Sequence, residues 1–229
     1  MPVFYTPIRD VKSLSLLDEV SRVAGELEEG SMAGVITADP LSTALLKYSS
    51  MAKAQASGIP VYYLDVMNGL SPSLLERFGG DPSSVLMARV YSFRELLEGV
   101  EMVSDGSFVF VSSFPLLKGA DSDGMLELRR LVDLKALFLV LLTENTTLNE
   151  LDLMGEVRKS FLLPEMFEQL LVLRTGSYRG HYRLRFTVLR TYAERLEGLG
   201  EHDVPIDSTV ALLMGRSSQD RGKGGGKGR

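Results

Sequence analysis

At 229 residues, with 45% hydrophobic and 24% charged residues, the chain has the size and composition of a soluble α/β domain with a sizeable core. The absence of cysteine excludes disulfides, thiolate nucleophiles and cysteine metal sites, and the presence of only two histidines argues against a zinc centre. The net charge is −5. The lack of a signal-peptide pattern and the lack of an apolar run of about 18 residues predict a cytoplasmic protein with no membrane partner.

The first 91 residues alternate between helical and extended patterns. Apolar residues at helical spacing indicate the first helix, which Gly30 ends, and Pro72 stands in the first turn of the third helix. In chain order we predict a helix at 11–29, a strand at 33–37, a helix at 41–57, a strand at 60–66, a helix at 71–79 and a strand at 84–91.

The same alternation continues to residue 143. Ser92 and Glu95 are spaced as a capping box, in which two side chains satisfy backbone N–H groups at a helix start. We predict a helix at 93–103, a strand at 107–114, a helix at 124–133 and a strand at 134–143. Continuously apolar strands that alternate with helices indicate a mostly parallel sheet with helices on both faces.

After residue 143 the pattern changes. Residues 144–163 are polar and mixed, which indicates a long loop with a helical piece. Strand patterns at 168–174 and 182–190 flank a turn-rich stretch, so we predict an antiparallel hairpin at the sheet edge. The last 15 residues contain six glycines, which predicts a disordered tail.

The charge is unevenly distributed along the chain. From Gly215 to the C-terminus five basic residues face one acid, giving +4, so the preceding 214 residues carry −9. An acidic body with a basic end favours a localised contact with an anion over a generally basic nucleic-acid surface.

The segment VITADPLSTALL (35–46) has the strand–turn–helix layout of a phosphate-binding loop without its chemistry. Such a loop needs glycines whose amides wrap the phosphates, a lysine that neutralises them, and a Ser or Thr for Mg²⁺. Asp39 is negatively charged, Pro40 lacks an N–H, and Lys47 lies one turn too far along the helix to replace the lysine. The segment is either a plain strand–turn–helix or a decayed nucleotide site, whose residues are Ala38, Asp39, Pro40, Ser42 and Thr43.

Several stretches around this segment match one family in order and spacing. They are LDEV (17–20), GS (30–31), YLD (63–65), Pro72, the strand and helix at 85–98 and the basic hairpin at 171–190. Together they resemble the RecA/RadA recombinase superfamily, including its archaeal RadB-like and KaiC-like paralogs, over residues 14–190. The resemblance implies a RecA-like core at 14–213, preceded by an extended segment at 1–13 and followed by the tail at 214–229.

Where the sequence departs from this family, it loses catalytic groups. With Thr43 aligned to the family's Mg²⁺-binding Thr, Ser42 stands where the lysine belongs. Met67 takes the place of the glutamate that activates water, and Ser112 takes that of the second Mg²⁺-binding carboxylate. Each of these groups usually contributes about 10²-fold or more. We therefore predict an inactive ATPase-like domain, with no nucleotide cofactor and no metal.

The hairpin is the candidate contact surface. It carries five arginines and no acid between Val172 and Thr191, and strand alternation places Arg183 and Arg185 together on one face. Three interpretations remain open: phosphates and stacked bases of a nucleic acid, an acidic neighbouring subunit, or a solvated sheet edge. The predicted nucleic-acid-binding residues, with those of the basic tail, are Arg174, Arg179, Arg183, Arg185, Lys223, Lys227 and Arg229.

The resemblance implies a non-catalytic recombinase paralog in homologous recombination and DNA repair, acting as a DNA-binding accessory or a structural subunit. Its expected partners are single- or double-stranded DNA, and an active RecA-family recombinase or a second copy of the chain. Two alternatives stand beside it. One is a KaiC-like protein-interaction module without DNA binding, and the other is an ATPase that binds nucleotide through a rebuilt phosphate loop.

Overall fold

The computed structural model describes residues 11–67 and 69–215. Ten strands lie within these ranges, of which the first two form a small sheet of their own. The strands are β1 (Ser13–Leu14), β2 (Leu27–Glu28), β3 (Ser31–Thr37), β4 (Val61–Asp65), β5 (Val85–Arg89), β6 (Phe108–Ser112), β7 (Phe138–Glu144), β8 (Gln169–Tyr178), β9 (His181–Arg190) and β10 (Gly200–Pro205).

Seven α-helices and four short 3₁₀ helices connect these strands within the described ranges. The α-helices are α1 (Asp18–Ala24), α2 (Pro40–Ala56), α3 (Pro72–Arg77), α4 (Phe93–Met102), α5 (Ser122–Leu134), α6 (Leu153–Ser160) and α7 (Asp207–Leu213). The 3₁₀ helices are η1 (Pro82–Ser84), η2 (Phe114–Leu116), η3 (Pro164–Met166) and η4 (Ala193–Gly198).

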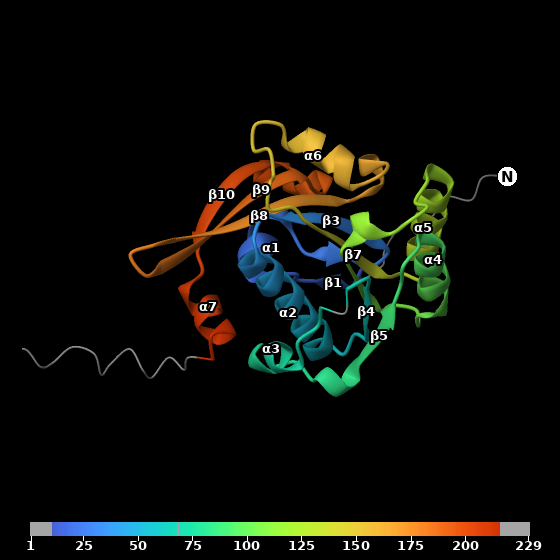
Figure 1. The fold of residues 1–229 in the computed structure, drawn as a ribbon, viewed down its shortest axis with the longest axis horizontal. Coiled ribbons are helices and arrows are strands. Elements are labelled where there is room, and N and C mark those ends of the chain that lie inside the picture. The colour runs from blue at the N-terminus through green and yellow to red at the C-terminus, as the bar shows by residue number, and fades with distance from the viewer. Residues whose placement is uncertain (1–10, 68, 216–229) are drawn as a thin grey trace, which may run out of the picture.

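The main sheet has eight strands in the order β10-β9-β8-β3-β7-β6-β4-β5. The six strands from β8 to β5 run parallel, and β9 and β10 extend the sheet in antiparallel fashion. Figure 1 shows helices on both faces of this sheet. The predicted α/β class, the mostly parallel sheet and the C-terminal antiparallel hairpin are thus confirmed, and the layout is consistent with a RecA-like fold.

Two apolar clusters hold the helices against the sheet. Residues from α1, α2, α3 and α7 pack on one face, and residues from α4, α5 and α6 pack on the other. Every residue of β3 and β6 is buried, because these central strands are covered on both sides. Successive side chains of a strand point to opposite faces of the sheet, so alternation decides which of them face α2. This also holds for the side chains at the carboxyl ends of the strands.

The helix predicted at 11–29 was wrong over most of its length. Only Asp18–Ala24 is helical, and Gly25 ends the helix with a positive φ of 81°. On either side, Leu14 and Leu27 pair across β1 and β2 and are both buried. Their apolar spacing fits a helix in sequence, yet it arises here from a two-stranded antiparallel sheet that contributes both leucines to the core.

The start of one strand and the edge of the sheet also differ from the prediction. The strand expected at 134–143 begins only at Phe138, because α5 runs to Leu134 and Ala136 turns the chain with a φ of 50°. The predicted hairpin is present, but it is not the sheet edge, since β10 pairs along β9. The sequence of β10 is polar and alternates in exposure, so it lacks the apolar run that marks the other strands.

The predicted capping box at α4 is present with one change of partner. The Ser92 hydroxyl accepts a hydrogen bond from the Glu95 N–H, and the Glu95 carboxylate accepts one from the N–H of Tyr91, one residue earlier than the pattern implies. Within the part of the chain that the structure describes, no helix is long and apolar enough to cross a membrane.

Candidate functional site

The carboxyl ends of the parallel strands bring the predicted nucleotide-site residues to one edge of the sheet. Thr37 ends β3, Asp65 ends β4, Ser112 ends β6 and Glu144 ends β7. Asp65 and Ser112 are direct neighbours in the register of β4 and β6, and both are buried. Ligands of open α/β sheets bind outside such carboxyl ends, where the strand order reverses, so this edge is where a nucleotide site is expected.

The Asp39 side chain holds the turn between β3 and α2 through four hydrogen bonds. It is the N-cap residue of α2, and its carboxylate accepts hydrogen bonds from the Ser42 N–H at 2.8 Å and the Ser42 hydroxyl at 3.0 Å. It also accepts bonds from the N–H of Thr175 at 2.7 Å and from the Thr175 hydroxyl at 2.6 Å. Hydrogen-bond donors at a helix N-terminus commonly bind a phosphate. Here the protein's own Asp39 carboxylate already accepts from them.

Two further polar groups of the turn also have partners within the protein. The N–H of Ala38 donates to the carbonyl of Leu173 at 2.9 Å, which extends the sheet pairing to β8. Pro40 is the first helical residue and has no N–H. The Thr43 hydroxyl, aligned with a Mg²⁺ ligand, lies 2.6 Å from that of Thr37 and is buried. The turn therefore presents neither the amide cradle nor the hydroxyl of a phosphate-binding loop.

Lys47 lies closer to this site than its sequence position suggests. It is 5% exposed and lines a cavity of about 190 Å³ together with Thr37, Asp39 and Glu144. Its ammonium donates to the Tyr63 hydroxyl at 3.2 Å and to the Gly69 carbonyl at 3.0 Å. The lysine is thus held on the β4 side of the cavity by neutral acceptors.

A short relay links this lysine to the end of β4. The Tyr63 hydroxyl, which accepts from Lys47, donates to the Asp65 carboxylate at 2.9 Å. Burial lowers the pKa of Lys47, and the charges of Asp65 and Glu144 oppose this shift. Burial also raises the pKa of Tyr63, while a hydrogen bond with Ser112 opposes that rise. In both residues the cause is the same, since burial removes water that would stabilise the charged form.

The positions predicted to have lost the general base and the metal carboxylate offer no replacement. The Met67 side chain is 70% exposed, and its backbone N–H donates to Asp65 at 3.1 Å. Ser112 is buried beside Asp65 and carries no charge. In residues 11–67 and 69–215 there is no group of three or more His, Cys, Asp or Glu side chains that fits a metal ion.

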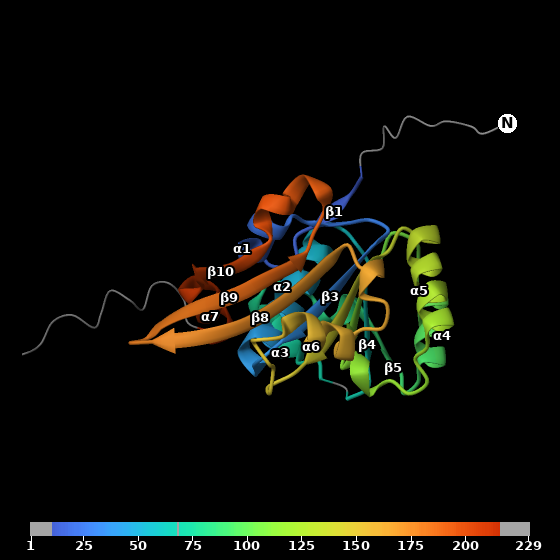
Figure 2. The same ribbon diagram turned by 90° about the horizontal axis from the view of Figure 1, so that it is seen from above.

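The arginine-rich hairpin of β8 and β9 projects beyond the body of the molecule, as Figures 1 and 2 both show. Strand alternation works as predicted: Leu184, Phe186 and Val188 are buried, and Arg183 and Arg185 lie on the opposite face with half-exposed side chains. Arg174 lies on this same face, directly opposite Arg185 in the register. The structure therefore brings three of the predicted arginines together.

These three arginines all have acidic partners. Arg183 is 2.7 Å from Asp203 and Arg185 is 3.5 Å from the same carboxylate, while Arg174 forms an ion pair with Glu150. The hairpin sequence contains no acid, so its composition gave no sign of these pairs. Both partners come from other segments, one from β10 and one from the loop before α6.

The tip of the hairpin is a two-residue turn. Arg179 and Gly180 both have positive φ, at 51° and 80°, which is the pattern of a tight turn whose twist suits paired strands. Tyr178 is 69% exposed, and the Arg179 guanidinium lies 5.0 Å from the centre of its ring. This exposed pair offers a flat aromatic and cationic surface. The remaining predicted contacts, Lys223, Lys227 and Arg229, lie outside the described residues.

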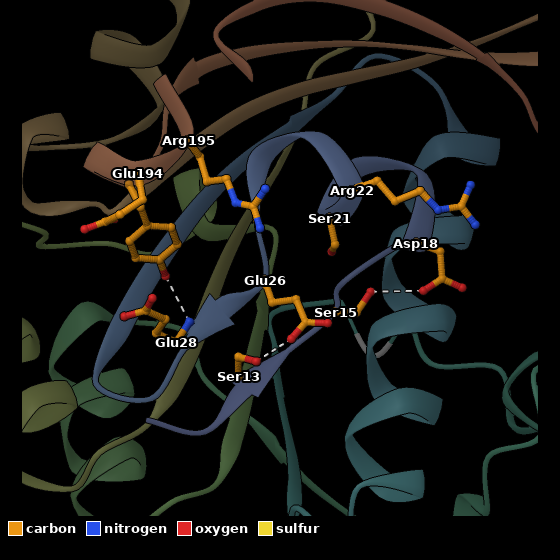
Figure 3. A pocket seen from close by; sticks show the side chains of 11 residues that line it. Ser13, Ser15, Asp18, Ser21, Arg22, Glu26, Glu28, Glu194 and Arg195 are labelled. Atoms are coloured by element: carbon orange, nitrogen blue, oxygen red, sulfur yellow. Dashed lines mark hydrogen bonds between the residues drawn. The ribbon is translucent and has the colours of Figure 1, made fainter. Parts of the chain in front are cut away.

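A larger pocket, which sequence reasoning did not identify, lies between the β1–β2 sheet, α1 and η4. Its volume is about 530 Å³, and Figure 3 shows Arg195 pointing into it while Arg22 points away. The Tyr192 hydroxyl in its wall accepts from the Glu28 N–H at 2.9 Å, and burial raises the pKa of Tyr192 to about 12. Acidic and basic side chains both line the pocket, and they do not point to a common centre. Its residues come from segments 13–28 and 192–195, and no sequence motif links these two segments.

Comparison with known proteins does not identify this chain. No protein-family model matches the sequence, and no curated protein matches it significantly.

Proposed function

We propose that this protein is a RecA-like pseudo-ATPase, a non-catalytic recombinase paralog that serves in homologous recombination or DNA repair. It acts as a DNA-binding accessory or structural subunit beside an active RecA-family recombinase or a second copy of itself. The supporting observation is the Asp39 carboxylate, which accepts four hydrogen bonds at the N-terminus of α2. A triphosphate there would meet a fixed negative charge and would have to displace it from Thr175.

The hairpin supports the DNA-binding part of the proposal. Arg174, Arg183 and Arg185 share one face, and the exposed Tyr178 with Arg179 stands at the tip. Guanidinium groups bind phosphates, and an exposed aromatic ring stacks on unpaired bases. The segment thus combines the two contacts that single-stranded nucleic acid needs.

One observation favours the KaiC-like interaction module instead. Asp203 and Glu150 already pair with the three arginines of the hairpin face, which lowers the positive potential available to a phosphate chain. The position of Lys47 favours the other alternative, an ATPase with a rebuilt phosphate loop, because this lysine lines the cavity beside Asp39. Its ammonium, however, is bound to Tyr63 and Gly69.

A two-part titration tests the proposed function. Fluorescence anisotropy with labelled single- and double-stranded DNA, at low and at high salt, is expected to show binding that weakens with salt. Thermal denaturation with and without Mg-ATP is expected to show the same melting temperature. Absence of DNA binding at low salt would leave the interaction module as the better account, and Mg-ATP stabilisation by several degrees would contradict the pseudo-ATPase.

A further inference from the structure

The arginines of the hairpin belong to a charged row that crosses three strands. Arg174 on β8 lies opposite Arg185 on β9, and Arg185 lies opposite Asp203 on β10. Arg183 stands two residues before Arg185 and faces the same way. Like charges directly opposite each other destabilise a sheet, so Arg174 and Arg185 need acids beside them.

Those acids stand at both ends of the row. Asp203 pairs with Arg183 and Arg185, and Glu150 pairs with Arg174. Asp203 belongs to a strand of the sheet and is fixed by its pairing. Glu150 belongs to residues 145–152, the connection between β7 and α6, which we call the acidic cover. The cover contributes Glu150 and Asp152 and no basic residue.

The acidic cover is organised mainly by its own side chains. Asn145 accepts a hydrogen bond from the Thr147 N–H, and Asn149 accepts one from the Leu151 N–H, both at 3.1 Å. Asp152 caps α6 by accepting from the Gly155 N–H at 2.9 Å. These local turns do not depend on β8 or β9, so the cover can keep its shape when its contact with the hairpin is lost.

The contact between the acidic cover and the hairpin combines apolar packing with an exposed ion pair. A cavity of about 70 Å³ lies between them, lined by the apolar side chains of Leu148, Leu153 and Val172 and by the charged side chains of Glu150, Arg174, Arg185 and Glu201. The Glu150 side chain is 55% exposed and that of Arg174 is 30% exposed. Ion pairs this accessible to water are weak and are screened by salt, so competing phosphates can displace them.

We propose that the acidic cover masks a binding row for single-stranded nucleic acid, and that Glu150 competes with phosphates for Arg174. The proposal rests on the proposed DNA-binding function. Single strands are the favoured ligand because Tyr178, at the tip of the same hairpin, is exposed and can stack on an unpaired base. In this arrangement the strand's phosphates replace Glu150, and the bases reach the tip.

Charge-matched variants test this masking. Glu150→Gln removes the competing carboxylate, and Glu76→Gln, on the exposed side of α3 on the opposite face of the sheet, makes the same change in net charge. Anisotropy titration with a labelled oligothymidine at low salt is expected to give about fivefold tighter binding for E150Q and no change for E76Q. In an Arg174→Gln background, E150Q is expected to have no effect, because its target is gone.

The outcomes separate the two proposals. If the wild-type protein binds DNA and E150Q binds equally well, or if E76Q tightens binding as much, the masking is refuted and DNA binding stands. If only E150Q binds, the masking is supported in its strongest form. If neither protein binds at low salt, both the masking and the DNA-binding function are rejected. Circular dichroism melts of the four variants establish that each is folded.

Discussion

At the scale of single residues, Asp39 is the side chain on which the proposed loss of nucleotide binding rests. Its four hydrogen bonds connect the start of α2 to Thr175 on β8, far away in the sequence. The same carboxylate complements the positive end of a 17-residue helix. One residue thus stabilises the fold and excludes a second anion from the place where a phosphate would lie.

Loss of this carboxylate is expected to cost more than loss of an ordinary cap. Asp39→Ala removes the cap of α2 and leaves the two Thr175 donors without their acceptor. We expect this to lower the free energy of unfolding by about 2 kcal/mol. Asp121→Ala is the matched control, because Asp121 caps α5 through the Gly124 N–H alone. Its loss should lower the free energy of unfolding by about 1 kcal/mol. Urea denaturation measures both. Equal losses would mean that the bonds to Thr175 contribute nothing.

The buried Lys47 is expected to make stability depend on alkaline pH. Burial lowers its pKa below the ordinary 10.5, so the folded protein releases this proton at a lower pH than the unfolded chain. Between those two pKa values the unfolded state binds more protons, and stability rises with pH. Wild type should therefore gain unfolding free energy relative to Lys47→Met as the pH rises from neutral towards 10. A difference that stays constant over this range, measured by urea denaturation, would contradict the burial of a charged amine.

The sequence showed which groups of a phosphate-binding loop are missing, but it did not predict the long-range contacts of the residues that replace them. Asp39 and Pro40 are recognisable from the sequence as unsuited to a phosphate loop, and their roles as cap and first helical residue follow local rules. The bond to Thr175 and the ion pair between Glu150 and Arg174 join distant segments. Such pairings depend on strand register, which a single sequence does not specify at this level.

At the scale of elements, the β8–β9 hairpin carries the proposed DNA contact. Arg183→Ala with Arg185→Ala should weaken binding and reduce the slope of log affinity against log salt by about 1.5, since each lost phosphate contact contributes about 0.7–0.9. The matched control removes two exposed arginines elsewhere, Arg94 on α4 and Arg130 on α5. If the hairpin variant binds like wild type while circular dichroism shows it folded, the hairpin has no part in DNA binding.

Elements with continuous apolar patterns were predicted well, whereas β10 was missed and the first helix was predicted too long. The buried strands and α2 lie within a few residues of their expected positions, because burial on both faces enforces an uninterrupted apolar run. β10 was missed because its pairing with β9 needs backbone groups more than side chains. The first helix was predicted too long because Leu14 and Leu27, at helical spacing, pair instead across the two-stranded sheet of β1 and β2.

At the scale of the whole molecule, charge separates a body of −9 from a C-terminal stretch of +4. Deleting residues 216–229 should therefore weaken binding to single- and double-stranded DNA alike, because a basic tail attracts phosphates without reading sequence or strandedness. Anisotropy titration of the truncated and full-length chains with both DNA forms measures this. A truncated protein with undiminished affinity would assign the electrostatic contribution to the body alone.

A crystal of the protein soaked with Mg²⁺ and a non-hydrolysable ATP analogue tests the central claim, that the Asp39 carboxylate takes the place of a phosphate at the start of α2. The account predicts that Asp39 stays bound to Ser42 and Thr175, with no phosphate density at the start of α2. Ordered triphosphate density beside Ala38 and Thr43, with Asp39 turned away from Thr175, would contradict it.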